Sequence, residues 1–357
     1  MTKPNDSKIK VLRLGHVYYR HKDSAKAEKF LAAFGFIEVK REGKRIYYRG
    51  YGSEPFLYCL EESSANEFGG AALVVESLQD LEKARAIFPD ATEIYDLDEA
   101  PGGGRCVTVK DPIDGWPLHL VHGQTPVEPA KDYRYLDFNF VSWLLLFNWT
   151  EADLLLKPHK KNRAGNEFQR FEKGKIPLPY TGKCVPVSLT SASSGPALIH
   201  KLGHFGLCVT QFQKTFDFYT SNFNFVPSDI QHDETGRHIA SFIHLDLGET
   251  FTDHHSFFIF EGPKSHVHHS SFEVHDFDVE VLGHDYLRDQ GYQNCWGVGR
   301  HVLGSQIFDY WYDPSGFIVE HYVDGDQVNC HSKTNIELAT PDGLHVWGPR
   351  LPDGFLT

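Results

Sequence analysis

Three residues in the second half of the chain have side chains that commonly bind metal ions. They are His204 in LGHFGLCV, His269 in VHHSSFE and Glu320 in FIVEHYV. Two neutral imidazoles and one carboxylate on one face of a site leave adjacent coordination positions open, which is the ligand set of non-haem Fe(II) enzymes. Each residue alone could be an ordinary polar group. His268 could also replace His269, because neighbours on a strand point to opposite faces. The elements that carry these residues therefore determine whether they can meet.

The glutamate follows a tight turn. DPSG at residues 313–316 separates two runs of aromatic and β-branched residues, which predicts a turn between two strands. Alternation in the second strand puts Glu320 on one face with Ile318 and Tyr322. Burying an acid in so apolar a strand is costly unless it is paired or bound to a metal, so this strand requires a partner for Glu320.

The chain repeats the order strand, helix and several strands four times. LGH occurs at residues 14–16 and again at 202–204, and DPIDGWPLHLVHG (111–123) aligns with DPSGFIVEHYVDG (313–325). Self-similarity of this kind is typical of a duplicated architecture. We therefore predict an α+β fold of four βαβββ modules in two paired domains.

The two halves differ where a metal ligand would stand. His119 takes the position of Glu320 in the front half, and Gly70 falls near the position of His269. The front half thus keeps two potential ligands and lacks a third. We expect the chemistry to lie in the back half.

These repeats suggest where the domains of the chain begin and end. We expect an N-terminal domain at 9–124 without a complete metal site, a linker or insertion at 125–198, a catalytic domain at 199–326 and a C-terminal arm at 327–357. Residues 125–198 are rich in Pro, Ser, Gly and Lys, as linkers often are. They are either a long connector or partly spurious translated sequence, such as a retained intron. The arm is either a lid over the site or a terminal segment that only packs.

Composition limits the partners. The formal net charge of −13 over 357 residues argues against nucleic acid or an anionic membrane as the main partner. The longest apolar stretch, VSWLLLFNW, is too short to span a bilayer, and the N-terminus has no signal-peptide pattern. Six cysteines without CxxC spacing favour a reducing, cytoplasmic setting.

The segment around the turn carries a family signature. It contains a Gly-x-His, then Tyr-x-x-Asp-Pro-x-Gly, then Glu, at Gly299-x-His301, Tyr310-x-x-Asp313-Pro314-x-Gly316 and Glu320. Together with the duplication, it resembles the type I extradiol ring-cleavage dioxygenases of the vicinal oxygen chelate superfamily, the fungal-type members in particular. This group includes 2,3-dihydroxybiphenyl, catechol 2,3- and homoprotocatechuate 2,3-dioxygenases. The resemblance covers roughly 10–123 and 199–325. Asp309 departs from it, because the family has an apolar residue before the tyrosine.

The resemblance implies a role for each matched residue. The three candidate ligands would hold Fe²⁺, with Mn²⁺ as a possible substitute. His255, in DHHSFFIF, matches the acid–base histidine, and His301 and Tyr310 match the pair that hydrogen-bonds the substrate's hydroxyl oxygens. The implied substrates are a catechol-type vicinal diol and O₂, the product is a muconic semialdehyde, and the implied assembly is a homo-oligomer of a vicinal oxygen chelate (glyoxalase-like) fold.

Two other functions fit the same fold. A glyoxalase-like isomerase using another divalent metal would need the metal ligands but not His255, His301 and Tyr310 together. A non-catalytic small-molecule binding protein would need no metal ligands. No arginine cluster matches a known carboxylate-binding position, which disfavours a carboxylated catechol.

Overall fold

The N-terminal half forms one sheet from two modules. The computed structural model describes residues 8–129 and 195–356. The first module is β1 (Val11–His21), α1 (Ser24–Phe34), β2 (Ile37–Glu42), β3 (Arg45–Arg49) and β4 (Tyr58–Glu62); the second is β5 (Glu67–Val75), α2 (Leu78–Ile87), β6 (Tyr95–Asp96), β7 (Arg105–Lys110) and β8 (Pro117–His122). Their strands lie in the order β2-β3-β4-β1-β5-β8-β7-β6.

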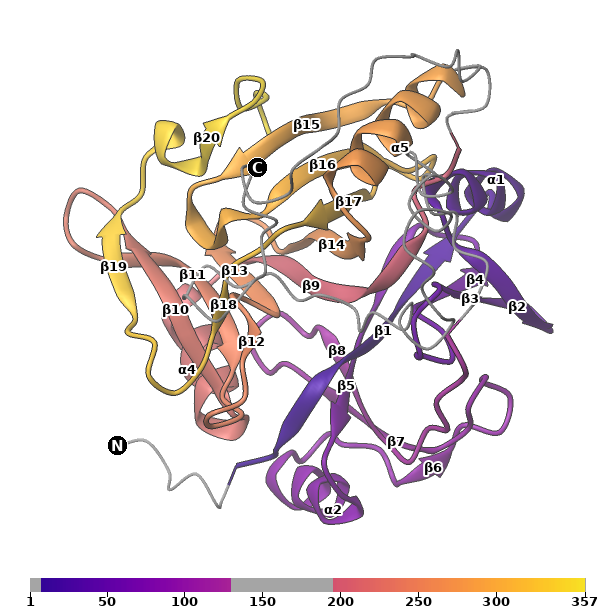
Figure 1. Ribbon diagram of the computed structural model, residues 1–357. Helices are drawn as coiled ribbons and strands as arrows, with labels where there is room; N and C mark the ends of the chain where they lie inside the picture. Colours follow the sequence, from indigo (N-terminus) through magenta and orange to yellow (C-terminus); the bar gives the residue numbers. More distant parts are fainter. Residues whose placement is uncertain (1–7, 130–194, 357) are drawn as a thin grey trace, which may run out of the picture.

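The C-terminal half repeats this plan. The third module is β9 (Ile199–Val209), α4 (Phe212–Asn222), β10 (Phe225–His232), β11 (His238–Leu245) and β13 (Phe257–Glu261); the fourth is β14 (His266–Val274), α5 (Phe277–Asp289), β15 (Asn294–His301), β16 (Ile307–Tyr312) and β17 (Ile318–Val323). Four βαβββ modules in two paired domains are thus present, as the repeats predicted (Figure 1).

The C-terminal arm supplies both edges of the second sheet. It contains β18 (Gln327–Val328), β19 (Asn335–Leu338), the 3₁₀ turn η4 (Pro341–Leu344) and β20 (His345–Trp347). The ten strands follow the order β19-β10-β11-β13-β9-β14-β17-β16-β15-β20, while β18 pairs separately with β12 (Thr252–Asp253). The arm therefore passes from one edge of this sheet to the other, drawn in yellow in Figure 1.

The strand register brings the candidate residues into one row. Ser271 on β14 is opposite His204 on β9 and also opposite Glu320 on β17. Tyr310 on β16 is in turn opposite Glu320. Because alternate residues of a strand share a face, His269 lies on the same face as Ser271. The repeat of modules thus delivers side chains from four neighbouring strands to one place.

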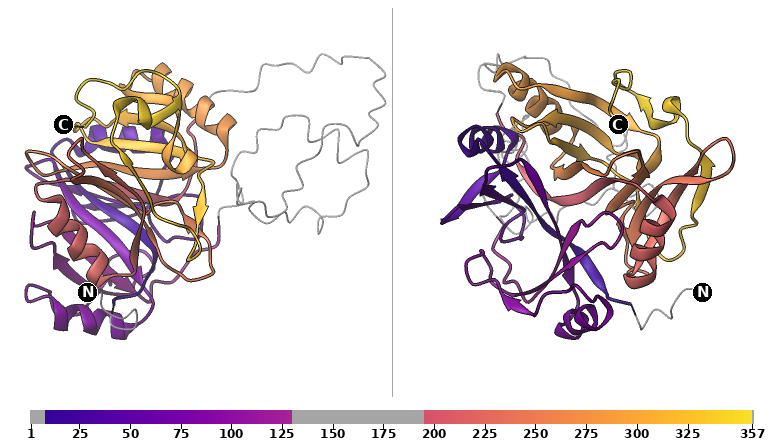
Figure 2. Two further views of the ribbon diagram at one scale, coloured as in Figure 1. Left: turned by 90° about the vertical axis from the view of Figure 1, so that its left-hand side faces the viewer. Right: turned by 180° about the vertical axis from the view of Figure 1, so that it is seen from behind.

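The two halves share a continuous hydrophobic core and pack side by side in every view (Figure 2). Side chains also connect them: the hydroxyl groups of Tyr19 and Ser270 lie 2.7 Å apart, and His321 Nε2 donates to the carbonyl of Phe34 at 2.7 Å. Helix α1 packs against α5 across this boundary. The C-terminal sheet therefore packs against the N-terminal domain.

The structure describes only part of the expected linker. Most of the expected linker, residues 130–194, lies outside the described residues, and so does the suggestion that part of it is spurious translated sequence. Within the described ranges, no helix combines the length and the apolar character needed to cross a membrane.

Candidate metal centre

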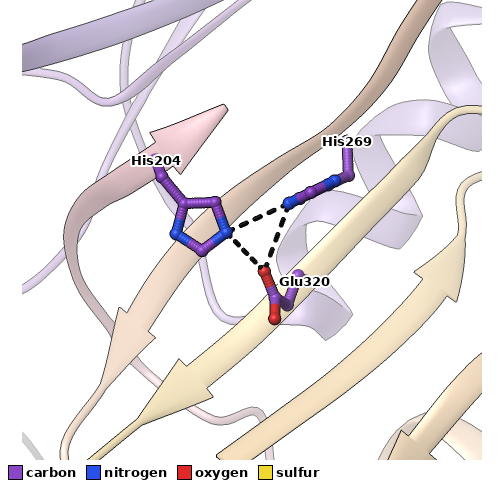
Figure 3. Close-up of side chains that lie close together, drawn as sticks. All are labelled: His204, His269 and Glu320. Atoms are coloured by element: carbon purple, nitrogen blue, oxygen red, sulfur yellow. Dashed lines mark hydrogen bonds and ion pairs between the residues drawn. The ribbon is translucent and has the colours of Figure 1, made fainter. Parts of the chain in front are cut away.

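His204, His269 and Glu320 meet in the interior of the C-terminal sheet (Figure 3). Nε2 of His204 lies 3.0 Å from Oε2 of Glu320 and 3.0 Å from Nε2 of His269, which is itself 3.6 Å from the same oxygen. All three side chains are buried, Glu320 completely. Residues 65 and 51 positions apart in sequence thus present their donor atoms to one point.

The separations of these atoms match those expected for the ligands of a single metal ion. Both carboxylate oxygens of Glu320 are buried and make no hydrogen bond of acceptable geometry, although a buried acceptor left unsatisfied is costly. With metal–ligand bonds of about 2.1 Å, two ligands at a right angle around one ion stand about 3.0 Å apart. The observed separations of 3.0 to 3.6 Å fit a single divalent ion.

The electrostatics of the site agree with this fit. Burial, the largest single effect, raises the pKa of Glu320, but His204, His301 and Ser271 together lower that pKa below its usual value. Burial, reinforced by His268, lowers the pKa of His269 well below its usual value. The site therefore presents a carboxylate beside a neutral imidazole, and a divalent cation would leave it with a net charge of about +1.

The structure separates His268 from His269. Nε2 of His268 donates to the carbonyl of Phe355 at 2.6 Å, and its Nδ1 lies 2.6 Å from Nδ1 of His269. His269 therefore points Nε2 at the other two candidate ligands, His204 and Glu320, whereas His268 points toward the C-terminal arm. The alternative ligand left open by the sequence faces away.

His255 lies directly against the candidate ligand His204. It sits in the short connection between β12 and β13, 3% exposed, with its ring centroid 4.1 Å from that of His204. Burial, followed by the neighbouring histidines, lowers its pKa well below the usual value. The imidazole is thus neutral and close enough to act on a molecule bound at the ligands.

A second histidine, His254, contacts the ring of His255. Nδ1 of His254 is 3.2 Å from Nδ1 of His255, and its Nε2 lies 2.7 Å from Oδ2 of the buried Asp229. His254 and Asp229 line a cavity of about 410 Å³, whose walls also include Ser228 and Asp326. Sequence reasoning missed this support, and the only signal was the His254-His255 doublet.

His301 and Tyr310 form a hydrogen-bonded pair beside Glu320. Nε2 of His301 is 2.9 Å from the hydroxyl of Tyr310 and 3.9 Å from Oε1 of Glu320, and its Nδ1 donates to the carbonyl of Leu344 at 2.8 Å. Burial, followed by Glu320, raises the pKa of Tyr310 well above its usual value. Trp296 stacks on the tyrosine ring, with centroids 5.8 Å apart. The pair therefore offers a phenolic hydroxyl and an imidazole nitrogen within an aromatic wall.

Asp309 does not disturb this wall. Alternation along β16 turns it away from the Tyr310 face, and it is fully buried. Its carboxylate lies 2.9 Å from Nδ1 of His284 on α5 and accepts from the side chains of Asn294 (2.9 Å) and Trp311 (2.6 Å). The departure from the family pattern is accommodated by a polar cluster on the opposite face.

The matched positions of the front half are engaged in other contacts. His119 has Nε2 2.9 Å from the carbonyl of Gly69 and Nδ1 2.9 Å from the hydroxyl of Thr108. The ring of His16 lies against that of Phe56 at a tilt, with the centroids 3.8 Å apart. Within residues 8–129 and 195–356, the other group with metal-ligand spacing is an exposed cluster of Glu249, Cys330 and His331 in the C-terminal half.

Comparisons with known proteins agree with this fold. Residues 201–321 match the Glyoxalase/Bleomycin resistance protein/Dioxygenase superfamily. Metapyrocatechase 2 of Cupriavidus necator is 31% identical over 160 residues, which are 44% of this chain and 48% of that protein. The match thus spans about half of the relative's length. Over the matched residues, these sequence comparisons confirm the resemblance to extradiol dioxygenases that the motif indicated.

Solved structures match over nearly the whole chain. Homoprotocatechuate 2,3-dioxygenase from Brevibacterium fuscum, in an anaerobic substrate complex, superimposes with a TM-score of 0.73 at 16% identity, covering 99% of this chain and 93% of that one. A Mn(II)-bound glyoxalase from Novosphingobium aromaticivorans gives 0.68 at 20% identity, covering 97% of each chain. At these identities the likeness shows the fold, which both share.

Proposed function

We propose that this chain, whose residues 201–321 belong to the Glyoxalase/Bleomycin resistance protein/Dioxygenase superfamily, is an Fe(II)-dependent extradiol dioxygenase. It would cleave the ring of a catechol-type vicinal diol with O₂ to a muconic semialdehyde-type product. The observation that carries the proposal is the assembly of His255, His301 and Tyr310 around the same buried point as the three metal ligands.

The metal would be held by His204, His269 and Glu320, with Mn²⁺ as an alternative to Fe²⁺ because ligand identity does not separate them. When bound, it supplies a template that holds the diol and O₂ side by side and polarises the oxygen atoms that it contacts. The remaining tasks fall to side chains of this chain.

His255 would move the protons. A vicinal diol has to lose a proton to chelate a cation, and a neutral imidazole can accept it and return it later. Its Nδ1 faces His254, so Nε2 is the nitrogen available to the substrate. Asp229, 2.7 Å from the far nitrogen of His254, favours a hydrogen on that nitrogen and therefore an acceptor at Nδ1 of His254.

His301 and Tyr310 would bind the two oxygens of the diol. The raised pKa of Tyr310 keeps its hydroxyl protonated, so it can donate a hydrogen bond to a deprotonated substrate oxygen. Because Nδ1 of His301 donates to the Leu344 carbonyl, its Nε2 is an acceptor, and it accepts from the Tyr310 hydroxyl at 2.9 Å. A bound diol would replace that contact: the tyrosine would donate to the deprotonated oxygen, and Nε2 of His301 would accept from the remaining hydroxyl. The pair thus distinguishes the two oxygens of an asymmetric anion.

The surroundings favour an uncharged substituent on the ring. Trp296, Phe308 and Phe355 form an aromatic cluster with Tyr310. Arg300, on the neighbouring strand β15, is engaged by Asp324 at 2.9 Å. An aromatic wall stabilises a flat apolar ring, and a paired arginine does not offer a free charge for a carboxylate. We therefore propose a catechol without a carboxyl group.

Two further expectations accompany this function. The C-terminal arm, whose Phe355 packs on the tyrosine ring with centroids 5.0 Å apart, would act as a lid over the site. We also propose that the protein acts in the cytoplasm as a homo-oligomer, with small molecules rather than nucleic acid or membranes as its partners.

A glyoxalase-like isomerase is the second candidate, supported by the coverage of 97% shared with the Mn(II)-bound glyoxalase. An isomerase of that kind needs the three ligands and does not require His301 and Tyr310 as a diol-binding pair. A non-catalytic binding protein would require neither group.

One experiment separates these functions. The protein is reconstituted anaerobically with Fe²⁺ and mixed with a panel of catechols and oxygen, and a parallel sample receives hemithioacetals, the substrates of glyoxalases. Uptake of O₂ with a yellow ring-opened product is expected, and the metal-free protein is the control. Absence of uptake with every vicinal diol would reject ring cleavage. Isomerisation without uptake would support the second candidate, and binding without turnover would support the third.

A further inference from the structure

The C-terminal arm contacts two histidines of the site through its backbone. The carbonyl of Phe355 accepts from Nε2 of His268 at 2.6 Å, and the carbonyl of Leu344 accepts from Nδ1 of His301 at 2.8 Å. A carbonyl oxygen can only accept a hydrogen bond. The hydrogen on each of these rings is therefore placed by the arm.

The hydrogen on His268 determines the hydrogen on its neighbour. A neutral imidazole carries one N–H, so His268 with its hydrogen on Nε2 has a lone pair on Nδ1. That lone pair lies 2.6 Å from Nδ1 of His269, a distance at which two lone pairs would repel each other. His269 must then carry its own hydrogen on Nδ1. This leaves the lone pair of His269 on Nε2, the atom that faces His204 and Glu320.

The opposite arrangement would disable the ligand. If His269 carried its hydrogen on Nε2, it would direct an N–H at the metal position and could not coordinate an ion there. Partners behind ligating histidines fix the tautomer in this way, and their loss commonly lowers metal affinity by about 10- to 100-fold.

The arm is firmly placed for this task. Phe355 is 6% exposed, and its ring centroid lies 4.7 Å from that of His268 and 5.0 Å from that of Trp296. Trp296 also donates from Nε1 to the carbonyl of Pro349 at 2.8 Å. These contacts hold the Phe355 carbonyl against His268 independently of the edge pairing at β20.

We infer that the C-terminal arm is a working part of the metal centre: the Phe355 carbonyl, acting through His268, sets the tautomer of His269 that binds the ion. His268 and Phe355 are positioning residues, and docking of the arm is coupled to metal affinity. The inference rests on the metal site of the proposed function but not on ring cleavage. Its test is accordingly metal binding and not turnover.

The test compares two pairs of variants of the full protein. Deletion of residues 355–357 removes the carbonyl and the ring, whereas deletion of Thr357 alone shortens the chain but leaves the Phe355 carbonyl neutral within a peptide bond. His268→Phe keeps a buried ring without nitrogen atoms. His268→Gln places an amide N–H toward Phe355 and an amide oxygen toward His269, in imitation of the imidazole. The dissociation constant for Mn²⁺ is measured by competition with a chelator, and unfolding temperatures of the metal-free proteins are recorded alongside.

The expected result is a Mn²⁺ affinity about 10- to 100-fold weaker for the 355–357 deletion and for His268→Phe, with affinity largely restored in His268→Gln and unchanged in the deletion of Thr357. A purely structural role for His268 would not be rescued by glutamine. Equal affinity in wild type and His268→Phe would overturn the inference. Because the His268 variants leave the arm complete, they decide the question even if the deletion fails to fold. Failure of the wild type to bind Mn²⁺ or Fe²⁺ would instead reject the metal site itself.

Discussion

Glu320→Gln tests the proposed metal centre most directly, because this residue supplies the only negative charge among the three candidate ligands. At an ion–oxygen distance of about 2.1 Å, a divalent ion and a carboxylate attract each other by roughly 16 kcal/mol at an effective dielectric constant of about 20. Most of this is offset by the cost of removing water from both charges. Changes behind the ligands already weaken binding by about 10- to 100-fold. We therefore expect Glu320→Gln to weaken Fe²⁺ or Mn²⁺ binding by more than about 100-fold, or about 2.7 kcal/mol.

The variant should affect metal binding far more than folding. Glutamine keeps the volume of the buried side chain, so no cavity forms. Its amide can donate to Nε2 of His204, which lies 3.0 Å from the present carboxylate. The unfolding temperature of the metal-free protein is accordingly expected to change by only a few degrees.

The assay is anaerobic competition with a chelator of known affinity, followed by measurement of the metal content after dialysis. Glu234→Gln, at an exposed position in the turn between β10 and β11, makes the same change of charge away from the site and serves as the control. Retention of wild-type affinity by Glu320→Gln would refute the assignment of the ligands.

Four further outcomes are expected. His255→Ala should retain the metal but lose about 10²- to 10⁴-fold in turnover, the usual contribution of a proton-transferring side chain; full activity would show that its assigned role is wrong. Truncation after Gln327, assayed at saturating Fe²⁺ because the arm is also coupled to metal affinity, should raise KM for catechols if the arm is a lid, and an unchanged KM for every catechol would count against it. Burial raises the pKa of Asp313 from 3.8 to about 6, so the folded protein should lose up to about 3 kcal/mol of stability as pH rises through that interval; urea unfolding at pH 4 and pH 7 should show a smaller difference for Asp313→Asn. Asp309→Leu should cost about 1–3 kcal/mol, because it leaves the buried indole N–H of Trp311 and the partly exposed His284 without their acceptor, and the double variant with His284→Leu should recover part of that loss in thermal unfolding.

The sequence alone was sufficient for the fold and for His204 and Glu320 as candidate ligands, and it narrowed the third candidate to His268 or His269. Repeats report the architecture because each module is a local unit whose hydrophobic pattern and turns recur in the chain. The same repetition placed His204, His269 and Glu320 at corresponding strand positions. Alternation along β17 puts Glu320 on one defined face of its strand, where it can meet the side chains of the neighbouring strands. Their convergence in space follows from the register of three adjacent strands.

Other features depended on tertiary contacts between distant segments. The choice between His268 and His269 depends on which ring reaches the carbonyl of Phe355, 87 residues away, and backbone carbonyls have no signature in a sequence. The burial of Asp309 likewise depends on His284, which only the packing of α5 brings to it. A sequence pattern determines which face of a strand a side chain occupies, whereas the partner that it meets there is determined by how separate elements pack.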